Sequence, residues 1–266
     1  MWIIIAILIL ASVYLFLVAP RMFGKPDRTC LYGVHYAHRG LFDNETDAPE
    51  NSLRAIRKAV QAGYGIEFDV QLSKDDIPVV FHDASLQRMC GVDGKVWEYT
   101  LEELQKMKLG KSNETIPTLE RVLETVSGSV PLIIEYKMDR ADTKVCKLGN
   151  ELLKHYEGPY CIESFHPSAV QWYRKNRPDV VRGQLSENYA RYGKKAFYLR
   201  VMTYLLTNFL TRPDFIAYKH QDADNFSRRL CKEMGALSVA WTIKSPEQYE
   251  EVKEEFDLFI FDSCVL

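Results

Sequence analysis

The segment Tyr64-Gly-Ile-Glu67-Phe-Asp69-Val-Gln-Leu-Ser-Lys-Asp75-Asp76-Ile-Pro78-Val-Val-Phe-His82-Asp83 decides the fold, because two apolar runs flank a single pair of acids. Two residues cannot connect parallel strands, which need a crossover of about a dozen residues or more. We therefore predict an antiparallel hairpin with Asp75 and Asp76 as its loop. In that register residue 74 pairs with residue 77, and Asp69 lies opposite His82.

The first strand of this hairpin carries two acids, Glu67 and Asp69, at positions two apart. Successive side chains of a strand point to opposite faces, so both carboxylates lie on one face and can share a cation. The alternative interpretation is a solvated acidic face, but the intervening positions are apolar and bury the opposite face. Pro78 places the second strand at a sheet edge. The segment thus predicts half of a metal site, with the imidazole of His82 beside it.

Length and composition narrow the class of protein. The chain has 266 residues, 47% hydrophobic residues and a formal net charge of −2, so it can bury a sizeable core in one large domain or two small ones. Lysines and arginines are scattered among acids, which argues against nucleic-acid binding. The six cysteines lack C-x-x-C pairs, which argues against a zinc knuckle or a dense disulfide framework.

The N-terminal segment Trp2–Ala19 is apolar and uncharged. As a helix its 18 residues would be about 27 Å long, which predicts a transmembrane anchor over residues 1–20. A linker over residues 21–30 and a globular domain over residues 31–266 would follow it. A cleaved signal peptide is the alternative, but the segment lacks a charged n-region and an A-x-A cleavage site.

Positive charges follow this segment at Arg21, Lys25 and Arg28, whereas only the α-amino group precedes it. Because positive flanking charges tend to stay in the cytoplasm, this bias predicts a single-pass protein of the cell membrane with a cytoplasmic catalytic domain.

The globular domain alternates between apolar runs and helical patterns. Strands are expected near residues 34, 66, 133, 161, 182, 215, 239 and 259. Eight strands with interleaved helices predict the α/β class and a closed (β/α)8 TIM barrel, with an open doubly wound sheet as the alternative. The segment 83–116 predicts a small insertion of loops and short helices.

A closed barrel of this kind assembles its active site at the C-terminal ends of its strands. Polar residues lie at those predicted ends: His38, Arg39, Glu67, Asp69, Glu135, Lys137, Trp241 and Asp262. We therefore expect these side chains to converge.

The residue types at these strand ends suit a metal-dependent reaction on an anion. The carboxylates of Glu67, Asp69 and Glu135 form an oxygen-rich site without thiolates, which favours Ca²⁺ or Mg²⁺. Arg39 and Lys137 add positive charge beside it, which an anionic phosphodiester needs for binding and for stabilising its transition state.

Two histidines, His38 and His82, remain for proton transfer. One imidazole can deprotonate the attacking oxygen while the other protonates the leaving alkoxide, and imidazole suits both tasks at neutral pH. A metal ion, a guanidinium group and two imidazoles together indicate cleavage of a phosphodiester.

The motifs from about residue 35 to the C-terminus resemble the glycerophosphodiester phosphodiesterase family in order and spacing. They are His38-Arg39-Gly40, Pro49-Glu50-Asn51-Ser52, Glu67-Phe-Asp69, Pro78-Val-Val-Phe-His82-Asp83, Ile116-Pro-Thr-Leu119, Glu135-Tyr-Lys137, Ser164-Phe165, Trp241-Thr242 and Asp262. The resemblance implies a PLC-like phosphodiesterase barrel. It also implies a role for each of the matching residues: catalysis by His38 and His82, metal binding by Glu67, Asp69 and Glu135, and phosphate contacts from Arg39 and Lys137.

Two further residues have supporting roles in this interpretation. Glu50 is expected to orient Arg39 or its loop rather than to bind metal. Trp241 is expected to form a wall against the glycerol part of the substrate. The loop residues Asp75 and Asp76 depart from the Asp-Gly that the family often has. An aspartate can replace the glycine at some conformational cost.

These features predict a membrane-anchored, metal-dependent hydrolase that converts glycerophosphodiesters to glycerol 3-phosphate and an alcohol. A lysophospholipase D acting on membrane lysolipids is a second hypothesis. A non-catalytic membrane-bound binding module is a third, although no catalytic or metal-binding residue is missing from the motifs. The sequence leaves open the head group and whether water attacks directly or after a cyclic phosphate forms.

Overall fold

The computed structural model describes residues 1–138, 141–194, 196–262 and 264–266, and its strands form a single sheet. The sheet closes into a barrel because β1 (Tyr36–His38) pairs in parallel with both β9 (Leu258–Phe261) and β2 (Gly65–Leu72). The prediction of a closed (β/α)8 barrel is confirmed, and an open sheet is excluded.

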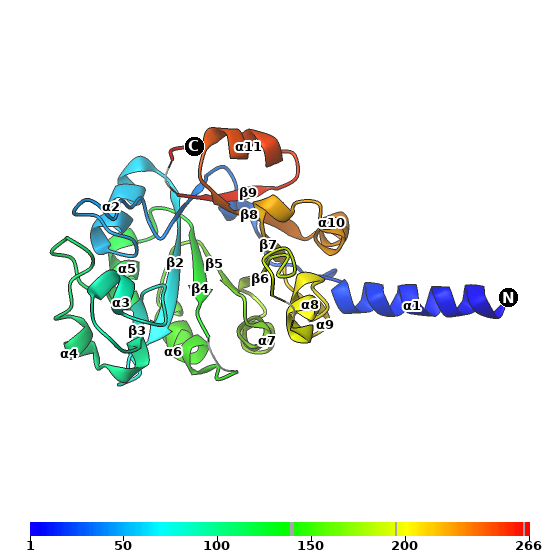
Figure 1. The fold of residues 1–266 in the computed structure, drawn as a ribbon, viewed down its shortest axis with the longest axis horizontal. Helices are drawn as coiled ribbons and strands as arrows, with labels where there is room; N and C mark the ends of the chain where they lie inside the picture. The colour runs from blue at the N-terminus through cyan, green and yellow to red at the C-terminus, as the bar shows by residue number, and fades with distance from the viewer. Residues whose placement is uncertain (139–140, 195, 263) are drawn as a thin grey trace.

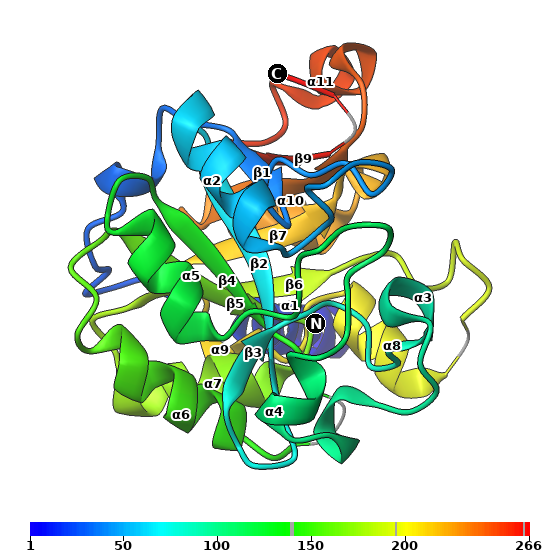
Figure 2. The ribbon, with the colours of Figure 1, turned by 90° about the vertical axis from the view of Figure 1, so that its left-hand side faces the viewer.

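The strands of the barrel alternate with helices that cover its outside (Figures 1 and 2). The remaining parallel strands are β4 (Leu132–Tyr136), β5 (Tyr160–Ser164), β6 (Val181–Ser186), β7 (Phe215–Lys219) and β8 (Leu237–Ile243). The helices between the strands are α2 (Leu53–Ala62), α5 (Leu119–Val126), α6 (Lys144–Leu153), α7 (Pro167–Asn176), α8 (Phe197–Thr203), α9 (Asn208–Thr211), α10 (Phe226–Glu233) and α11 (Pro246–Val252). Short 3-10 turns are η1 (Thr29–Leu31) and η3 (His220–Asp222).

Side chains of the strands alternate between two cores. In β4, Leu132 and Ile134 belong to the layer between the sheet and the helices, whereas Ile133 belongs to the cluster inside the barrel. Glu135 has the same parity as Ile133 and therefore points into the barrel, near the C-terminal end of its strand. The alternation thus places an acid where the barrel interior opens.

The hairpin forms as predicted, with β3 (Pro78–Val80) antiparallel to β2, but its register differs by one residue. Phe81, rather than His82, lies opposite Asp69, and the Phe81 amide donates a hydrogen bond to the Asp69 carbonyl at 3.0 Å. The loop spans residues 74–76 because Asp76 adopts a left-handed φ of 64° and adds a residue to the turn. The predicted pairing of Asp69 with His82 is therefore wrong.

Helix α2 begins after Ser52 and not after the neighbouring Asn51. The hydroxyl of Ser52 accepts the hydrogen bond from the Ala55 amide at 3.1 Å, so Ser52 is the N-cap. Asn51 adopts a φ of 59°, which turns its side chain toward the barrel interior.

The segment between β3 and α5 contains α3 (Gln87–Cys90), η2 (Val96–Glu98) and α4 (Leu101–Leu104). It has a hydrophobic cluster of its own, which includes Leu86, Val96 and Leu104. Figure 2 shows α3 and α4 on the same side of the barrel as β3. The assignment of residues 83–116 as an insertion, like the other domain boundaries, stays a prediction.

Helix α1 (Trp2–Val18) extends away from the domain, with the N-terminus at its far end (Figure 1). Its last turn packs on the domain: Val18 is buried, and Arg212 donates a hydrogen bond to the Ala19 carbonyl at 2.7 Å. Within the described residues, no helix has both the length and the apolar character that crossing a membrane requires. The predicted transmembrane anchor is therefore not supported, because the helix ends after 17 residues where tertiary contacts begin.

We predict that Gly183→Ala destabilises the protein. Gly183 lies inside the barrel on β6, where an added Cβ would overlap the ring of Phe215 on β7. Overpacking of this kind typically costs about 1–3 kcal/mol, which urea unfolding followed by circular dichroism would measure. In a Phe215→Leu background the same substitution should cost less, because the smaller side chain leaves room. An equal cost in both backgrounds would contradict this account of the barrel interior.

Candidate active site

Three buried carboxylates form the centre of the site. Glu67 and Asp69 come from β2 and Glu135 from β4, and parallel pairing makes Asp69 and Glu135 direct neighbours. One oxygen from each lies within 4.8 Å of the others. An all-oxygen donor set of this spacing fits a hard cation such as Ca²⁺ or Mg²⁺. The structure therefore brings together the three predicted metal ligands.

Without a bound cation, the three carboxyl groups differ in pKa and therefore in charge. Burial raises the pKa of Glu67 well above its usual value, and Asp69 raises it further. Burial likewise raises the pKa of Glu135 to about 7. Burial would also raise the pKa of Asp69, but Lys137, His82 and Arg39 outweigh this effect and hold it far below the usual range. Asp69 is thus the permanently charged member of the cluster.

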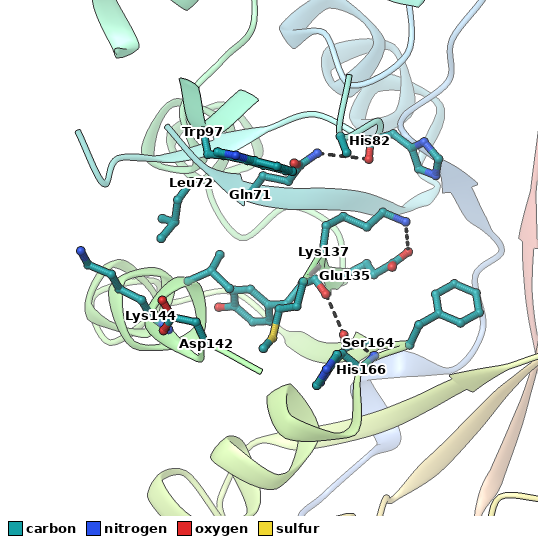
Figure 3. A pocket seen from close by; sticks show the side chains of 15 residues that line it. Gln71, Leu72, His82, Trp97, Glu135, Lys137, Asp142, Lys144, Ser164 and His166 are labelled. Carbon is teal, nitrogen blue, oxygen red and sulfur yellow. Dashed lines mark hydrogen bonds and ion pairs between the residues drawn. The ribbon is translucent and has the colours of Figure 1, made fainter. Parts of the chain in front are cut away.

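Lys137 lies at the end of β4 and points toward the same cluster (Figure 3). Its Nζ is 2.7 Å from Glu135 Oε2 and 3.0 Å from Asp69 Oδ1. Burial would lower the pKa of Lys137, but the carboxylates outweigh it and keep the ammonium charged. In the absence of a metal ion, the ammonium group supplies part of the positive charge that these carboxylates require.

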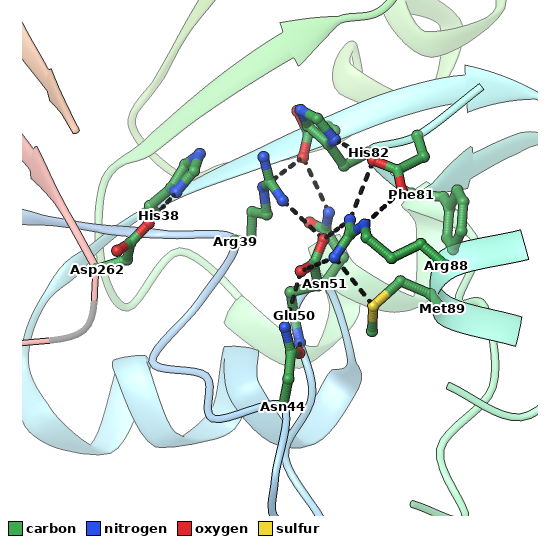
Figure 4. Close-up of polar contacts among 12 residues, drawn as sticks. His38, Arg39, Asn44, Glu50, Asn51, Phe81, His82, Arg88, Met89 and Asp262 are labelled. Carbon is green, nitrogen blue, oxygen red and sulfur yellow. Dashed lines mark hydrogen bonds and ion pairs between the residues drawn. The ribbon is translucent and has the colours of Figure 1, made fainter. Parts of the chain in front are cut away.

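Arg39 follows β1 and is held by acids on two sides (Figure 4). Its Nη1 donates to Glu50 Oε1 at 2.7 Å, and its Nε lies 3.5 Å from Asp69 Oδ2. Glu50 also accepts hydrogen bonds from Arg88 at 2.7 and 2.8 Å. Burial would raise the pKa of Glu50, but Arg88 and Arg39 lower it to about 2. Glu50 therefore contacts two guanidinium groups and lies outside the carboxylate cluster.

Each candidate catalytic histidine is oriented by a carboxylate. His38 Nδ1 lies 2.9 Å from Asp262 Oδ2, and His82 Nδ1 lies 2.6 Å from Asp83 Oδ1. A carboxylate partner at Nδ1 favours the tautomer that carries its proton there, which leaves Nε2 as the free base. Burial lowers the pKa of both imidazoles from its usual value, which favours their neutral forms.

Trp241 at the end of β8 lines a hollow of about 160 Å³ at the centre of the barrel. The hollow is also bordered by His38, His82 and members of the carboxylate cluster. The indole ring packs edge-on against Phe165, with ring centroids 5.5 Å apart. We call this space the inner hollow. It brings the predicted substrate-binding tryptophan into the same site as both histidines.

Three residues that contact this site were not predicted as site residues. Arg88 on α3 bridges Glu50 and Asp83, and Asn51 donates a hydrogen bond to Asp69 Oδ2 at 2.9 Å. Glu163 on β5 is buried beside Glu135 and lines the inner hollow. Two of the three carry a sequence signal: alternation along its strand points Glu163 into the barrel, and Asn51 lies in the motif Pro49-Glu50-Asn51-Ser52.

Ser164, which the sequence places at the same strand end as Glu163, has a structural role instead. Its hydroxyl donates a hydrogen bond to the Tyr136 carbonyl at 2.7 Å, which ties β5 to β4. Ser164 therefore lies on the face of β5 that points away from the barrel interior.

Comparison with protein families identifies one match over most of the domain. The model of the glycerophosphoryl diester phosphodiesterase family matches residues 38–262. A glycerophosphodiester phosphodiesterase of Caldanaerobacter subterraneus is 26% identical over 250 residues, which cover 85% of this chain and 92% of that protein. Putative glycerophosphodiester phosphodiesterase YhdW of Bacillus subtilis is 35% identical over 153 residues, which cover 54% of this chain and 62% of that protein.

Solved structures share the fold. A phosphodiesterase of Oleispira antarctica, solved in complex with its product sn-glycerol-3-phosphate, superposes with a TM-score of 0.71 at 25% identity, covering 88% of this chain and 94% of that one. A glycerophosphodiester phosphodiesterase of Thermotoga maritima gives a TM-score of 0.66 at 29% identity, covering 87% and 96%. These matches confirm the predicted family and a phosphodiesterase barrel.

We predict that Glu135→Gln changes the pH dependence of stability in EDTA. Folded Glu135 has a pKa of about 7, whereas an unfolded glutamate titrates near about 4.3. Between these values the folded state keeps a proton that the unfolded state has lost, so the free energy of unfolding falls as pH rises. Thermal melts should show the wild type losing more stability than Glu135→Gln between about pH 5 and about pH 7.5.

The same melts with added Ca²⁺ or Mg²⁺ provide the control. Because metal ligands must be deprotonated, the ion should stabilise the wild type more at the higher pH and stabilise Glu135→Gln little at either. Parallel pH profiles for the two proteins in EDTA would contradict this assignment.

Proposed function

Because the chain belongs to the glycerophosphoryl diester phosphodiesterase family, we propose that it hydrolyses glycerophosphodiesters to glycerol 3-phosphate and an alcohol. The observation that carries this proposal is the convergence of an oxygen-only metal site with two carboxylate-oriented histidines at one end of the barrel. Cleavage of an anionic phosphodiester requires positive charge, hydrogen-bond donors and groups that transfer protons, and this arrangement can supply all three.

Ca²⁺ or Mg²⁺ would be held by Glu67, Asp69 and Glu135. When bound, the ion supplies positive charge that neutralises the phosphoryl oxygens of the substrate. Arg39 and Lys137 flank the carboxylates and would bind the remaining charge of the phosphodiester. Glu50 would keep the Arg39 guanidinium in the orientation needed for that contact, through the hydrogen bond at 2.7 Å.

His38 and His82 would divide the two proton transfers. One neutral imidazole accepts the proton of the attacking oxygen at Nε2, and the other, in its protonated form, donates a proton to the departing alkoxide. Asp262 and Asp83 would stabilise the imidazolium that each histidine forms during the cycle. The attacking oxygen is either water or a hydroxyl of the glycerol, the second of which gives a cyclic phosphate.

An assay of head-group release tests this proposal. Full-length protein should release choline or ethanolamine from glycerophosphocholine or glycerophosphoethanolamine with Ca²⁺ or Mg²⁺, and release should stop in EDTA. His38→Ala should lower kcat by about 10²- to 10⁴-fold, the usual contribution of general acid–base catalysis. Glu67→Ala should abolish the metal-dependent turnover, because one ligand of the cation is lost.

The matched control is His155→Ala, since His155 lies outside the inner hollow. This variant should retain wild-type turnover. Turnover of lysolipids in place of the deacylated diesters would support the alternative of a lysophospholipase D. Absence of turnover on every substrate, with metal bound, would support the binding module.

We also propose that α1 attaches the protein to a lipid surface. The helix carries no charged residue, and apolar side chains such as Trp2, Ile3 and Leu10 are 78%, 76% and 69% exposed. A continuous exposed apolar surface of this kind indicates an interaction partner. The predicted location at the cell membrane, with the catalytic domain in the cytoplasm, stays a prediction.

Flotation with phosphatidylcholine vesicles tests the attachment. The wild type should float with the vesicles, and Ile3→Lys/Ile7→Lys/Leu10→Lys should lower the floating fraction about tenfold or more, because charges in α1 oppose burial in lipid. Val265→Lys places a charge at an exposed apolar position outside α1 and should float like the wild type. Equal flotation of all three proteins, or none, would contradict the proposal.

A further inference from the structure

A second cavity, of about 340 Å³, lies beside the inner hollow. The two cavities share four residues: His82, Glu135, Lys137 and Phe165. We call the second cavity the outer pocket. Figure 3 shows it running from the catalytic end, at His82 and Lys137, to Asp142 and Lys144 at the other end. A substrate that reacts beside His82 can therefore extend into the outer pocket.

The wall between these two ends is more apolar than polar, with Gln71, Ser164 and His166 as its polar members. Its apolar part is formed by Leu72 from β2, Tyr136 and Met138 at the end of β4, Val145 from α6 and Trp97 from η2. The volume lies in the range of pockets that bind small organic molecules, about 300–1,000 Å³. The outer pocket is thus large enough for a chain of several carbon atoms and offers it an apolar surface.

The inner hollow suits the other part of the substrate. A polyol such as glycerol needs a polar partner for each buried hydroxyl group. The carboxylate cluster lies there, and two buried polar atoms on its lining, Trp241 Nε1 and Glu163 Oε2, have no hydrogen-bond partner within the described part of the chain. One is a donor and the other an acceptor, so together they can satisfy hydroxyl groups. The glycerol phosphate therefore fits the inner hollow.

The outer pocket offers little net attraction to a compact cationic head group. The Nζ of Lys95 lies 4.8 Å from the centroid of the Trp97 ring and so occupies one face of that ring. Lys144 stands at the far end, paired with Asp76 at 2.7 Å, and Lys137 stands at the catalytic end. At each end of the outer pocket an ammonium group is accompanied by a carboxylate, Asp142 at the far end and Glu135 at the catalytic end, so a cationic alcohol such as choline gains no net attraction there. An uncharged chain would meet the apolar wall.

We propose that the outer pocket binds the leaving alcohol and selects glycerophosphodiesters whose alcohol carries an apolar chain over those of choline or ethanolamine. The proposal rests on the proposed phosphodiesterase function and names the substrate class of the same site. It differs from lysophospholipase D activity, because a lysolipid carries its chain on the glycerol and not on the alcohol that leaves.

The test compares kcat/KM for two substrates, glycerophosphoethanolamine and the glycerophosphodiester of octanol, with the full-length protein and Mg²⁺ or Ca²⁺. The wild type should prefer the octyl ester about tenfold or more, since each buried methylene group adds binding energy. Trp97→Ala removes the largest apolar side chain of the wall and should lower this preference about fivefold or more. Trp97→Phe should restore most of it.

Phe197→Ala serves as the matched control, because Phe197 is an exposed aromatic residue that lies outside both cavities. It should leave the ratio of the two kcat/KM values unchanged. Leu72→Ser offers a second change in the same wall and should lower the ratio even if Trp97→Ala fails to fold.

The outcomes separate the two proposals. No turnover of either ester would overturn the phosphodiesterase function itself. Turnover of both esters without a preference for the octyl ester would overturn the selection by the outer pocket alone. The selection would also be overturned if Trp97→Ala and Leu72→Ser both left the ratio of the two kcat/KM values at its wild-type value.

Discussion

Repulsion among the buried carboxylates of Glu67, Asp69 and Glu135 is the constraint on which the rest of the site depends, because their oxygens lie within 4.8 Å of one another. Burying like charges is costly unless protons or cations neutralise them. Both means operate in this cluster: Glu67 and Glu135 have raised pKa values, and Lys137 contacts the two carboxylates nearest to it. A site that needs positive charge this strongly is prepared for a divalent cation, since binding the ion replaces protons that the carboxylates hold only because they are buried.

The same need for charge balance organises the surroundings of the cluster. Arg39 approaches Asp69 and is itself held by Glu50, which also accepts hydrogen bonds from Arg88. Arg88 in turn donates to Asp83, the residue that orients His82. Alternating acids and bases thus connect the loop after β1, the end of β3 and helix α3. Because each charged group has a partner of opposite sign, the guanidinium and imidazole groups are fixed before a substrate arrives.

Most of the fold and the centre of the site could be predicted from the sequence, because both follow from periodicity. Apolar runs predict the eight strands, and parity along a strand places Glu67, Asp69 and Glu135 on one interior surface. The features that could not be predicted depend on the backbone conformation of individual residues, which the residue types do not determine. Asp76 adopts a left-handed φ of 64° and shifts the hairpin register by one residue.

Tertiary contacts account for the other differences. Asn51 leaves the capping position to Ser52 and bonds Asp69 instead, because the loop after β1 returns close to β2. Arg88 lies on a helix of four residues, too short for a periodic signal, so only the folded chain shows that it reaches Glu50. The end of α1 at Val18 is likewise set by its packing against the domain.

The division of the site into two cavities shows where chemistry and selection originate in this fold. The inner hollow is built from strand ends, whose positions are dictated by the closure of the barrel, and it is lined by both candidate catalytic histidines. The outer pocket depends on Trp97, which lies on a 3-10 turn after β3 rather than on a barrel strand. Substitutions in that turn can change the shape of the outer pocket without moving a strand. Under the proposed assignment, selectivity for the alcohol can vary while the barrel keeps the candidate catalytic groups in place.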